Sequence, residues 1–218
     1  MLLWFESNGS HRHRRVTLSD SSYDDRRKLR ASLRARRWAV PPRDRAHLSQ
    51  LVARNVDRAF HLRPDWRIAV YAALPEELDT APLIDLARER GCHIYLPRID
   101  ARRSSGKMRF ILSGEERHRP NRFGISEPQG SKLLNARWLD VVFLPLVGFD
   151  ARGTRLGTGG GYYDRALGYI KARRAWRVPR LVGLAYAFQQ VERIAAAAHD
   201  VPLDAVVTEK GVIRCTTG

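Results

Sequence analysis

An apolar run, a cluster of glycines and a helical segment follow one another in the second half of the chain. The run covers residues 141–147 (VVFLPLV) and is typical of a strand buried on both faces. Four glycines fall within the five residues 157–161, and residues 162–174 have the length and composition of a helix. A strand that leads through glycines into a helix predicts an α/β fold, in which helices are layered on a sheet.

Further apolar runs predict the other strands of this sheet. Residues 68–73 and 92–96 flank a helical stretch from Asp79 to about Gly91, so they predict a βαβ unit with a parallel strand pair. More strands are predicted at 108–112, 181–186, 205–208 and 212–214. The last two are expected to pair as a hairpin. This alternation indicates a layered, mostly parallel sheet flanked by helices.

The N-terminal part of the chain is helical in its pattern. Helices are predicted at 24–38 and 43–60, separated by Pro41 and Pro42, and we expect this segment to pack on the sheet. A short helix is predicted at 189–198 and a structured loop at 123–128. Residues 1–22 are polar and lack periodicity, so we expect a disordered leader followed by a single domain over 23–218.

Cysteine content and apolar runs limit the cellular setting. Only Cys92 and Cys215 are present, without a paired framework or metal-ligand spacing, which favours a reducing compartment. The apolar start, residues 1–5, is too short for a signal sequence, and no run reaches the length of a membrane-spanning helix. We therefore expect a cytoplasmic protein with no membrane partner.

The chain is strongly basic, with a formal net charge of +16 that comes mostly from arginine. This charge suits polyanionic partners such as nucleotides, polycarboxylates or nucleic acids. A genome composition that favours arginine codons would give the same excess as a solvated surface. The charge outside the glycine region leaves both interpretations open.

The glycine region predicts a polyphosphate site. Its glycines permit a close approach of backbone N–H groups to a ligand, and the following helix start carries partial positive charge. Asp164 follows at once and is placed to hold the accompanying Mg²⁺. The string matches neither G-x-x-x-x-G-K-[ST] nor G-x-G-x-x-G, so the glycines alone specify phosphate binding and nothing finer.

The complete string resembles a known family. Gly148-Phe149-Asp150, followed by residues 155–164 (RLGTGGGYYD), is similar to the motif of the 5-formyltetrahydrofolate cyclo-ligases, also called 5,10-methenyltetrahydrofolate synthetases. Other matches occur in the family's order. They are Arg26-x-x-Leu29-Arg30, residues 75–80 (PEELDT), Phe123-Gly124-Ile125-x-Glu127-Pro128, and His199-Asp200-x-Pro202-x-Asp204 with residues 206–209 (VVTE). Together these matches extend from about residue 24 to residue 214.

The resemblance implies an ATP- and Mg²⁺-dependent ligase that forms a C–N bond in a ring. It would convert 5-formyltetrahydrofolate, with or without a polyglutamate tail, to 5,10-methenyltetrahydrofolate and release ADP and phosphate. Phosphorylation of the formyl oxygen and attack by the folate N10 would accomplish this without a covalent enzyme intermediate. The implied partners are these small molecules, with no nucleic acid, and the implied state is a monomer.

The resemblance also implies roles for particular residues. Arg155 and Tyr162 are the expected catalytic residues, and Asp164 and Asp200 the expected Mg²⁺ ligands. The expected ATP-binding residues are Arg26, Arg30, Arg155, Leu156, Gly157, Thr158, Gly159, Gly160, Gly161, Tyr162 and Tyr163. The expected folate-binding residues are Ala72, Glu77, Thr158, Gly159, Gly160, Gly161 and Tyr162. For Asp150 the simplest interpretation is a turn residue.

Two residues depart from the family pattern. Arg26 stands where the family has lysine, and Thr158 stands where it usually has a larger residue. Two alternatives to the cyclo-ligase remain: a basic nucleic-acid-binding module without catalysis, and another ATP-dependent ligase on the same scaffold. Glu77 and the loop at 123–128 argue against the nucleic-acid module, which has no need of them.

Overall fold

A computed structural model describes residues 18–99, 108–114, 118–120, 126–128, 133–172 and 179–216. Its main sheet has eight strands in the order β12-β11-β10-β7-β1-β2-β3-β6. These are β1 (Arg67–Ala69), β2 (His93–Ile99), β3 (Met108–Leu112), β6 (Leu133–Leu134), β7 (Val141–Pro145), β10 (Arg180–Leu184), β11 (Ala205–Thr208) and β12 (Gly211–Arg214). Neighbouring strands from β11 to β2 are parallel, and β12, β3 and β6 add antiparallel edges.

The sheet confirms the predicted α/β class and its mostly parallel core. β1 and β2 pair in parallel on either side of α3 (Ala81–Glu89), as the βαβ pattern predicted. β11 and β12 form the predicted hairpin. Two small antiparallel pairs lie outside the main sheet: β4 (His118–Pro120) with β5 (Ser126–Pro128), and β8 (Gly148–Phe149) with β9 (Arg155–Leu156).

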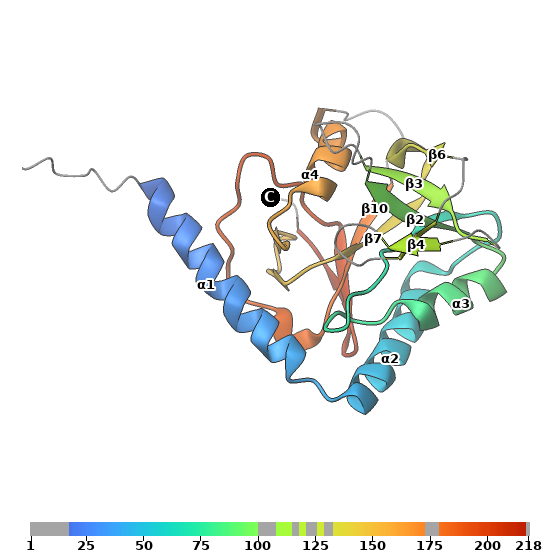
Figure 1. Cartoon of the computed structure of the whole chain (residues 1–218), viewed down its shortest axis with the longest axis horizontal. Coiled ribbons are helices and arrows are strands. Elements are labelled where there is room, and N and C mark those ends of the chain that lie inside the picture. The colour runs from blue at the N-terminus through green and yellow to red at the C-terminus, as the bar shows by residue number, and fades with distance from the viewer. Residues whose placement is uncertain are drawn as a thin grey trace, which may run out of the picture.

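The two faces of the sheet are covered differently. On one face α2 (Pro42–Phe60) and α3 pack side by side over Ile68, Val141 and other alternate strand residues (Figure 1). The intervening residues of the same strands, among them Ala69 and Val142, face a second core. That core is covered by α4 (Tyr162–Leu167) and by 3₁₀ turns, of which η1 is Ala136–Trp138 and η2 is Gly168–Ala172.

The first helix, α1 (Leu18–Trp38), lies along one side of the molecule, beside the loop that precedes β11 (Figure 1). It begins six residues before the predicted start at Asp24, so Leu18–Ser22 of the predicted leader are helical. Residues 1–17 lie outside the described residues, as do 123–125 of the predicted loop. Among the described residues, none of the helices combines the length and the apolar character that crossing a membrane requires.

Two predicted helices are corrected by the structure. The helix predicted at 162–174 ends at Leu167 and continues as the 3₁₀ turn η2, and residues 173–174 lie outside the described part. The helix predicted at 189–198 is wrong. The 3₁₀ turn η3 (Ala187–Gln189) is followed by an irregular segment. Its backbone N–H groups bond elsewhere, Ile194 N to Asp150 Oδ2 and Ala197 N to Asp200 Oδ2, so they are not available to a helical ladder.

Candidate active site

The carboxyl ends of β1 and β7 meet where the direction of the chain through the sheet reverses. β1 continues to β2 on one side, whereas its neighbour β7 continues to β10 on the other. In open α/β sheets, ligands bind outside the carboxyl ends of the strands at such a reversal. Glu77 follows β1, and the glycine loop (residues 157–161) follows β7 and the hairpin β8–β9. The predicted folate half-site, around Glu77, and the predicted ATP half-site, at the glycine loop, therefore both lie at this point.

The glycine loop is open to an approaching ligand. A methyl group added to Gly157 would meet no heavy atom within 4 Å, and Thr158, Gly159 and Gly160 are exposed. Gly159 has a φ of +106°, a conformation that side chains rarely adopt. Because α4 has only six residues, its dipole is a weaker argument for phosphate than the sequence suggested. The backbone N–H groups of the loop and the nearby arginines carry the argument instead.

Arg155 and Asp164 form the buried pair behind the loop. Arg155 is 5% exposed and donates to Asp164 Oδ1 at 2.6 Å and to the Val201 carbonyl at 3.0 Å. Asp164 Oδ1 also accepts from Val201 N at 3.2 Å. Among the described residues, both of these bonds to Asp164 end on Oδ1, and Oδ2 remains for a cation. The pair joins α4 to the segment that carries Asp200.

Asp200 lies next to Val201 and pairs with Arg26 of α1. Arg26 donates to Asp200 Oδ2 at 3.0 Å and to the Ala195 carbonyl at 3.1 Å. Burial raises the pKa of Asp200, but the Ala197 N–H and the Arg26 guanidinium outweigh it and lower the pKa below its usual value. Both predicted metal ligands are therefore close in the fold. In the described ranges, no cluster of three or more His, Cys, Asp or Glu residues is arranged for a metal.

One face of α1 contacts every part of this site. Its residues Arg26, Arg30, Leu33 and Arg37 recur at the three- and four-residue spacing of a helix face. Arg30 donates to the Gly157 carbonyl at 2.9 Å, and Leu33 is buried against Gly148. Arg37 reaches the loop after β1, where it contacts Glu76 and Glu77. Sequence analysis missed Arg37, although its place in this stripe, beside a buried leucine, was a readable signal.

Glu77 is held in a buried loop at the end of β1. Its Oε2 accepts from Leu74 N at 3.1 Å, and its carbonyl accepts from Tyr186 at 3.4 Å. Burial raises the pKa of Glu77, and the Leu74 N–H and the Arg37 charge partly oppose this rise. Ala72 is half-buried and lies between β1 and this loop.

Tyr163 is a buried tyrosine in the first turn of α4. Burial and then the charge of Glu77 raise the pKa of its hydroxyl, while Arg155 lowers it. Tyr162 and Tyr163 both pack partly against the core beneath α4, and Arg165 lies 4.9 Å over the Tyr162 ring.

Asp150 is the predicted turn residue, and the structure confirms it. Its Oδ1 accepts from Arg152 N and Thr154 N, both at 3.0 Å, and its Oδ2 holds Ile194 N. The carboxylate thereby fixes the turn before Arg155 and the loop before Asp200 together. Both carboxylate oxygens of Asp150 thus accept backbone N–H groups, and the role of this residue is structural.

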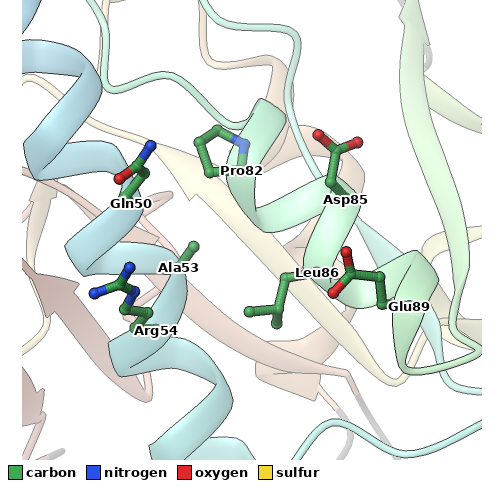
Figure 2. A pocket seen from close by; sticks show the side chains of 7 residues that line it. All are labelled: Gln50, Ala53, Arg54, Pro82, Asp85, Leu86 and Glu89. Carbon is green, nitrogen blue, oxygen red and sulfur yellow. The ribbon is translucent and has the colours of Figure 1, made fainter.

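A hollow of about 210 Å³ between α2 and α3 is a separate surface feature (Figure 2). It is lined by Gln50, Ala53, Arg54, Pro82, Asp85, Leu86 and Glu89. None of the predicted site residues lines it, and it opens between two regular helices away from the carboxyl ends of the strands. We therefore assign no role in the chemistry to this hollow.

Comparison with known proteins identifies relatives over most of the chain. The sequence model of the 5-formyltetrahydrofolate cyclo-ligase family matches residues 22–209. The 5-formyltetrahydrofolate cyclo-ligase of Escherichia coli (strain K12) is 34% identical over 185 residues, which cover 83% of this chain and 98% of the relative.

Two solved structures share the fold. The NMR structure of the Aquifex aeolicus 5,10-methenyltetrahydrofolate synthetase matches with a TM-score of 0.74 and 29% identity, over 88% of this chain and 94% of that one. A 5,10-methenyltetrahydrofolate synthetase from Mycoplasma pneumoniae matches with a TM-score of 0.66 and 24% identity, over 85% and 99%. At that identity the second match supports the fold alone.

Proposed function

The chain belongs to the 5-formyltetrahydrofolate cyclo-ligase family, and from this premise we propose that it converts 5-formyltetrahydrofolate to 5,10-methenyltetrahydrofolate with consumption of ATP. One observation carries the proposal: the glycine loop after β7 and the Glu77 loop after β1 converge at the reversal of the sheet. Two ligands that must react with each other need such neighbouring half-sites. Membership of an enzyme family also argues against a nucleic-acid-binding module without catalysis.

ATP is expected at the glycine loop. The open surface at Gly157 and Gly159 lets phosphate oxygens approach the backbone N–H groups. Arg155 stands directly behind the loop, and α1 adds Arg26 and Arg30 at its edge. Each guanidinium has five N–H donors, so an arginine that already bonds a carbonyl or a carboxylate retains donors for phosphate. These charges would stabilise the transferring phosphoryl group.

Mg²⁺ fits the pair Asp164 and Asp200. Mg²⁺ commonly uses one or two carboxylates together with phosphate oxygens and water, and the two residues are linked through Val201. When bound there, the ion would neutralise part of the charge on the phosphate oxygens. The lowered pKa of Asp200 keeps that carboxylate ionised at neutral pH. Arg26 and Arg155 hold both carboxylates in place from the protein side.

Folate is expected at the Glu77 half-site. A carboxylate that accepts two hydrogen bonds side by side suits the amino and ring N–H groups of the pterin. Ala72 would contact the same ring, and residues 158–162 would lie between folate and nucleotide. Because the resemblance implies catalytic roles for Tyr162 and Arg155, we propose that these two side chains act on the transferred group.

The chemistry follows from the weakness of a formamide as an electrophile, because its nitrogen donates into the carbonyl. The γ-phosphoryl group of ATP passes to the formyl oxygen, and ADP leaves. N10 of the folate then attacks the formyl carbon and loses its proton, and the C–O bond breaks to release phosphate. The protein's contribution is to hold both ligands in line and to stabilise charge at the phosphoryl group.

A direct assay tests the proposal. The full chain is incubated with ATP, Mg²⁺ and 5-formyltetrahydrofolate, and the ultraviolet absorption of the conjugated methenyl product is followed together with ADP and phosphate. We expect one ADP and one phosphate per methenyl group formed, and no product without ATP. Absence of product from a folded protein that binds neither ligand would overturn the proposal.

We also propose that residues 23–218 form one domain that acts as a monomer. Both core clusters lie on the same sheet, and α1 bonds to the loop before β11, which favours a single folding unit. Sedimentation of the purified chain should give the mass of one copy. A stable dimer at micromolar concentration would contradict this.

A further inference from the structure

Arg37, Glu76 and Glu77 form a group of ions that water barely reaches. Arg37 is 1% exposed, and the two glutamates are 3% and 6% exposed. Arg37 Nη2 lies 3.3 Å from Glu76 Oε1, and Nη1 lies 3.7 Å from Glu77 Oε1 and donates to the Leu146 carbonyl at 3.2 Å. One guanidinium thus connects the last turn of α1 with the loops that follow β1 and β7.

A buried group of ions such as this one contributes little net stability to a fold. Taking several charges out of water has a desolvation cost that their attraction repays only with good geometry, and apolar replacements of similar size often do as well. Here a single buried guanidinium serves two adjacent carboxylates, while Arg34, which is half exposed, helps Glu76 from the solvent side. Within the part of the chain that the structure describes, the Nε of Arg37 is buried and has no hydrogen-bond partner, so one of its donors is left unsatisfied.

We propose that Arg37 is a positioning residue for the folate half-site, which fixes the place and the charge of the Glu77 carboxylate from behind. The inference rests on the proposed function, in which Glu77 accepts hydrogen bonds from the pterin. Leu74 N fixes one carboxylate oxygen and Arg37 attracts the other, so the two contacts together orient the group. Because Arg37 lies on the same helix face as Arg26 and Arg30, α1 serves both half-sites.

Charge is the second part of the argument. Besides Leu74 N, the groups that act on the Glu77 carboxylate are Arg37 and Arg34, which favour its ionised form, and Glu76, which opposes it. Tyr71 and Tyr163 face the same carboxylate, and both have raised pKa values, so they stay neutral. Tyr186 and Arg45 donate to the Glu77 carbonyl. Without Arg37, Glu76 would still have the half-exposed Arg34 at 3.4 Å, but Glu77 would lose the positive charge beside its carboxylate and would take up a proton at a higher pH.

The test compares Arg37→Met with Arg34→Met in the full chain. Both variants remove one positive charge from α1 beside Glu76, but only Arg37 is buried and close to Glu77. Binding of 5-formyltetrahydrofolate and, separately, of ATP is measured by calorimetry from about pH 6 to about pH 9. Arg37→Lys is the conservative rescue, and Arg37→Met with Glu76→Gln removes the charge that opposes ionisation of Glu77.

We expect Arg37→Met to weaken folate binding roughly tenfold at neutral pH, with recovery as the pH rises, and to leave ATP binding within about twofold. Arg34→Met should stay within about twofold for both ligands. Arg37→Lys and the double variant should each recover part of the folate affinity. A purely structural role would instead weaken both ligands together, without a shift in the pH dependence, and that result would overturn the inference.

Glu77→Gln separates the two proposals. If it binds folate normally, the folate assignment of Glu77 and the role of Arg37 both fail. If it loses folate binding while Arg37→Met retains it at every pH, only the role of Arg37 fails. If Arg37→Met does not fold, the single variants Arg37→Lys and Glu76→Gln provide the test. Arg37→Lys should raise the pH at which half of the folate binding is lost, and Glu76→Gln should lower it. If neither variant shifts that pH, the inference is overturned.

Discussion

Ion pairs differ in burial between the face of the sheet that α2 and α3 cover and the edge where α1 meets the glycine loop. Over the face covered by α2 and α3, apolar residues such as Val56 and Leu83 form the contact, and the ion pair between Arg90 and Asp57 lies near the surface, with the arginine 54% exposed. At the edge where α1 meets the glycine loop, the side chains of Arg37 and Arg155 are only 2% and 4% exposed, and both pair with carboxylates.

The difference indicates where function lies. Surface ion pairs contribute little to stability, and buried pairs bring a desolvation penalty that apolar residues of similar size would avoid. We propose that the buried charges gathered at one end of the parallel strands are arranged for a charged ligand. On this proposal the face under α2 and α3 is a stabilising layer, and the edge under α1 binds the ligands. The following predictions test that division.

The largest effect is expected from Asp164→Asn. Asparagine keeps one oxygen for Arg155 and Val201 but loses the charge that would hold Mg²⁺, so turnover should fall by more than about 100-fold. The matched control is Asp57→Asn, which removes a carboxylate from the exposed pair with Arg90. We expect a change below about twofold there.

Turnover is followed by methenyl absorption, and the fold by circular dichroism on heating. Near-normal turnover in a folded Asp164→Asn protein would remove this residue from the metal site. A large loss from Asp57→Asn would break the division between the two sides.

Alanine substitutions at Gly157 and Gly153 distinguish an effect on ligand binding from an effect of backbone strain on stability. Gly157→Ala adds a methyl group in open space, so stability should change by less than about 1 kcal/mol, whereas the KM for ATP should rise roughly tenfold. Gly153 has a φ of +83°, and a methyl group there would lie 2.5 Å from the Leu203 carbonyl oxygen. Gly153→Ala should therefore lose about 3 kcal/mol of unfolding free energy.

Urea unfolding and steady-state kinetics measure the two effects. If Gly157→Ala binds ATP as the parent protein does, the open surface at the loop is not where phosphate approaches.

Val56→Ala tests the stabilising layer. The side chain of Val56 is fully buried in α2, and its truncation should reduce the unfolding free energy by about 2 kcal/mol. Since Val56 packs in the apolar core under α2 and is not one of the proposed ligand-binding residues, kcat/KM for both substrates should stay within about twofold at a temperature where the variant is folded. A selective loss of folate or ATP affinity would show that the layer takes part in binding.

The smallest effect is expected from Arg26→Lys, which introduces the lysine that the resemblance to the family leads us to expect at this position. A lysine retains the charge, and because Arg26 bonds both Asp200 and the Ala195 carbonyl through Nη1, a single ammonium nitrogen could take the place of that donor. We expect kcat/KM for ATP to change by less than about threefold, against a much larger loss in Arg26→Ala. Equal losses in both variants would mean that geometry at this position matters more than charge.

The strands of the core could be predicted from the sequence because strands buried on both faces leave a continuous apolar run. Their ends could not. The run at 68–73 forms ladder pairs only as far as Ala69, because pairing depends on what the neighbouring strands offer. The alanine-rich segment 189–198 has helix propensity, but Asp150, forty-four residues from Ile194 in sequence, captures one of its N–H groups. Such a tertiary bond leaves no local pattern.

In the candidate site, too, local sequence features could be predicted and long-range contacts could not. Glycines, Arg155 and Asp164 are neighbours in sequence, so one string sufficed to propose them together. The pairing of each aspartate with its own arginine was not predicted, since it depends on how α1 and the loop before β11 approach each other. Arg37 was not predicted because the arginine excess was equally compatible with a solvated surface, and only burial separates it from Arg34 and Arg36.

The bond between Arg26 and Asp200 has a consequence for how the protein is made. Its partners are 174 residues apart, so α1 is synthesised long before the carboxylate that it bonds. Until then Arg26 lacks this partner, whereas the partners of Arg30 and Arg37 have already been made. Contacts of such long sequence separation close slowly. A nascent chain that stops before Asp200 would therefore have most of its sheet and no closed site, and it would leave a basic helix exposed to any polyanion in the cell.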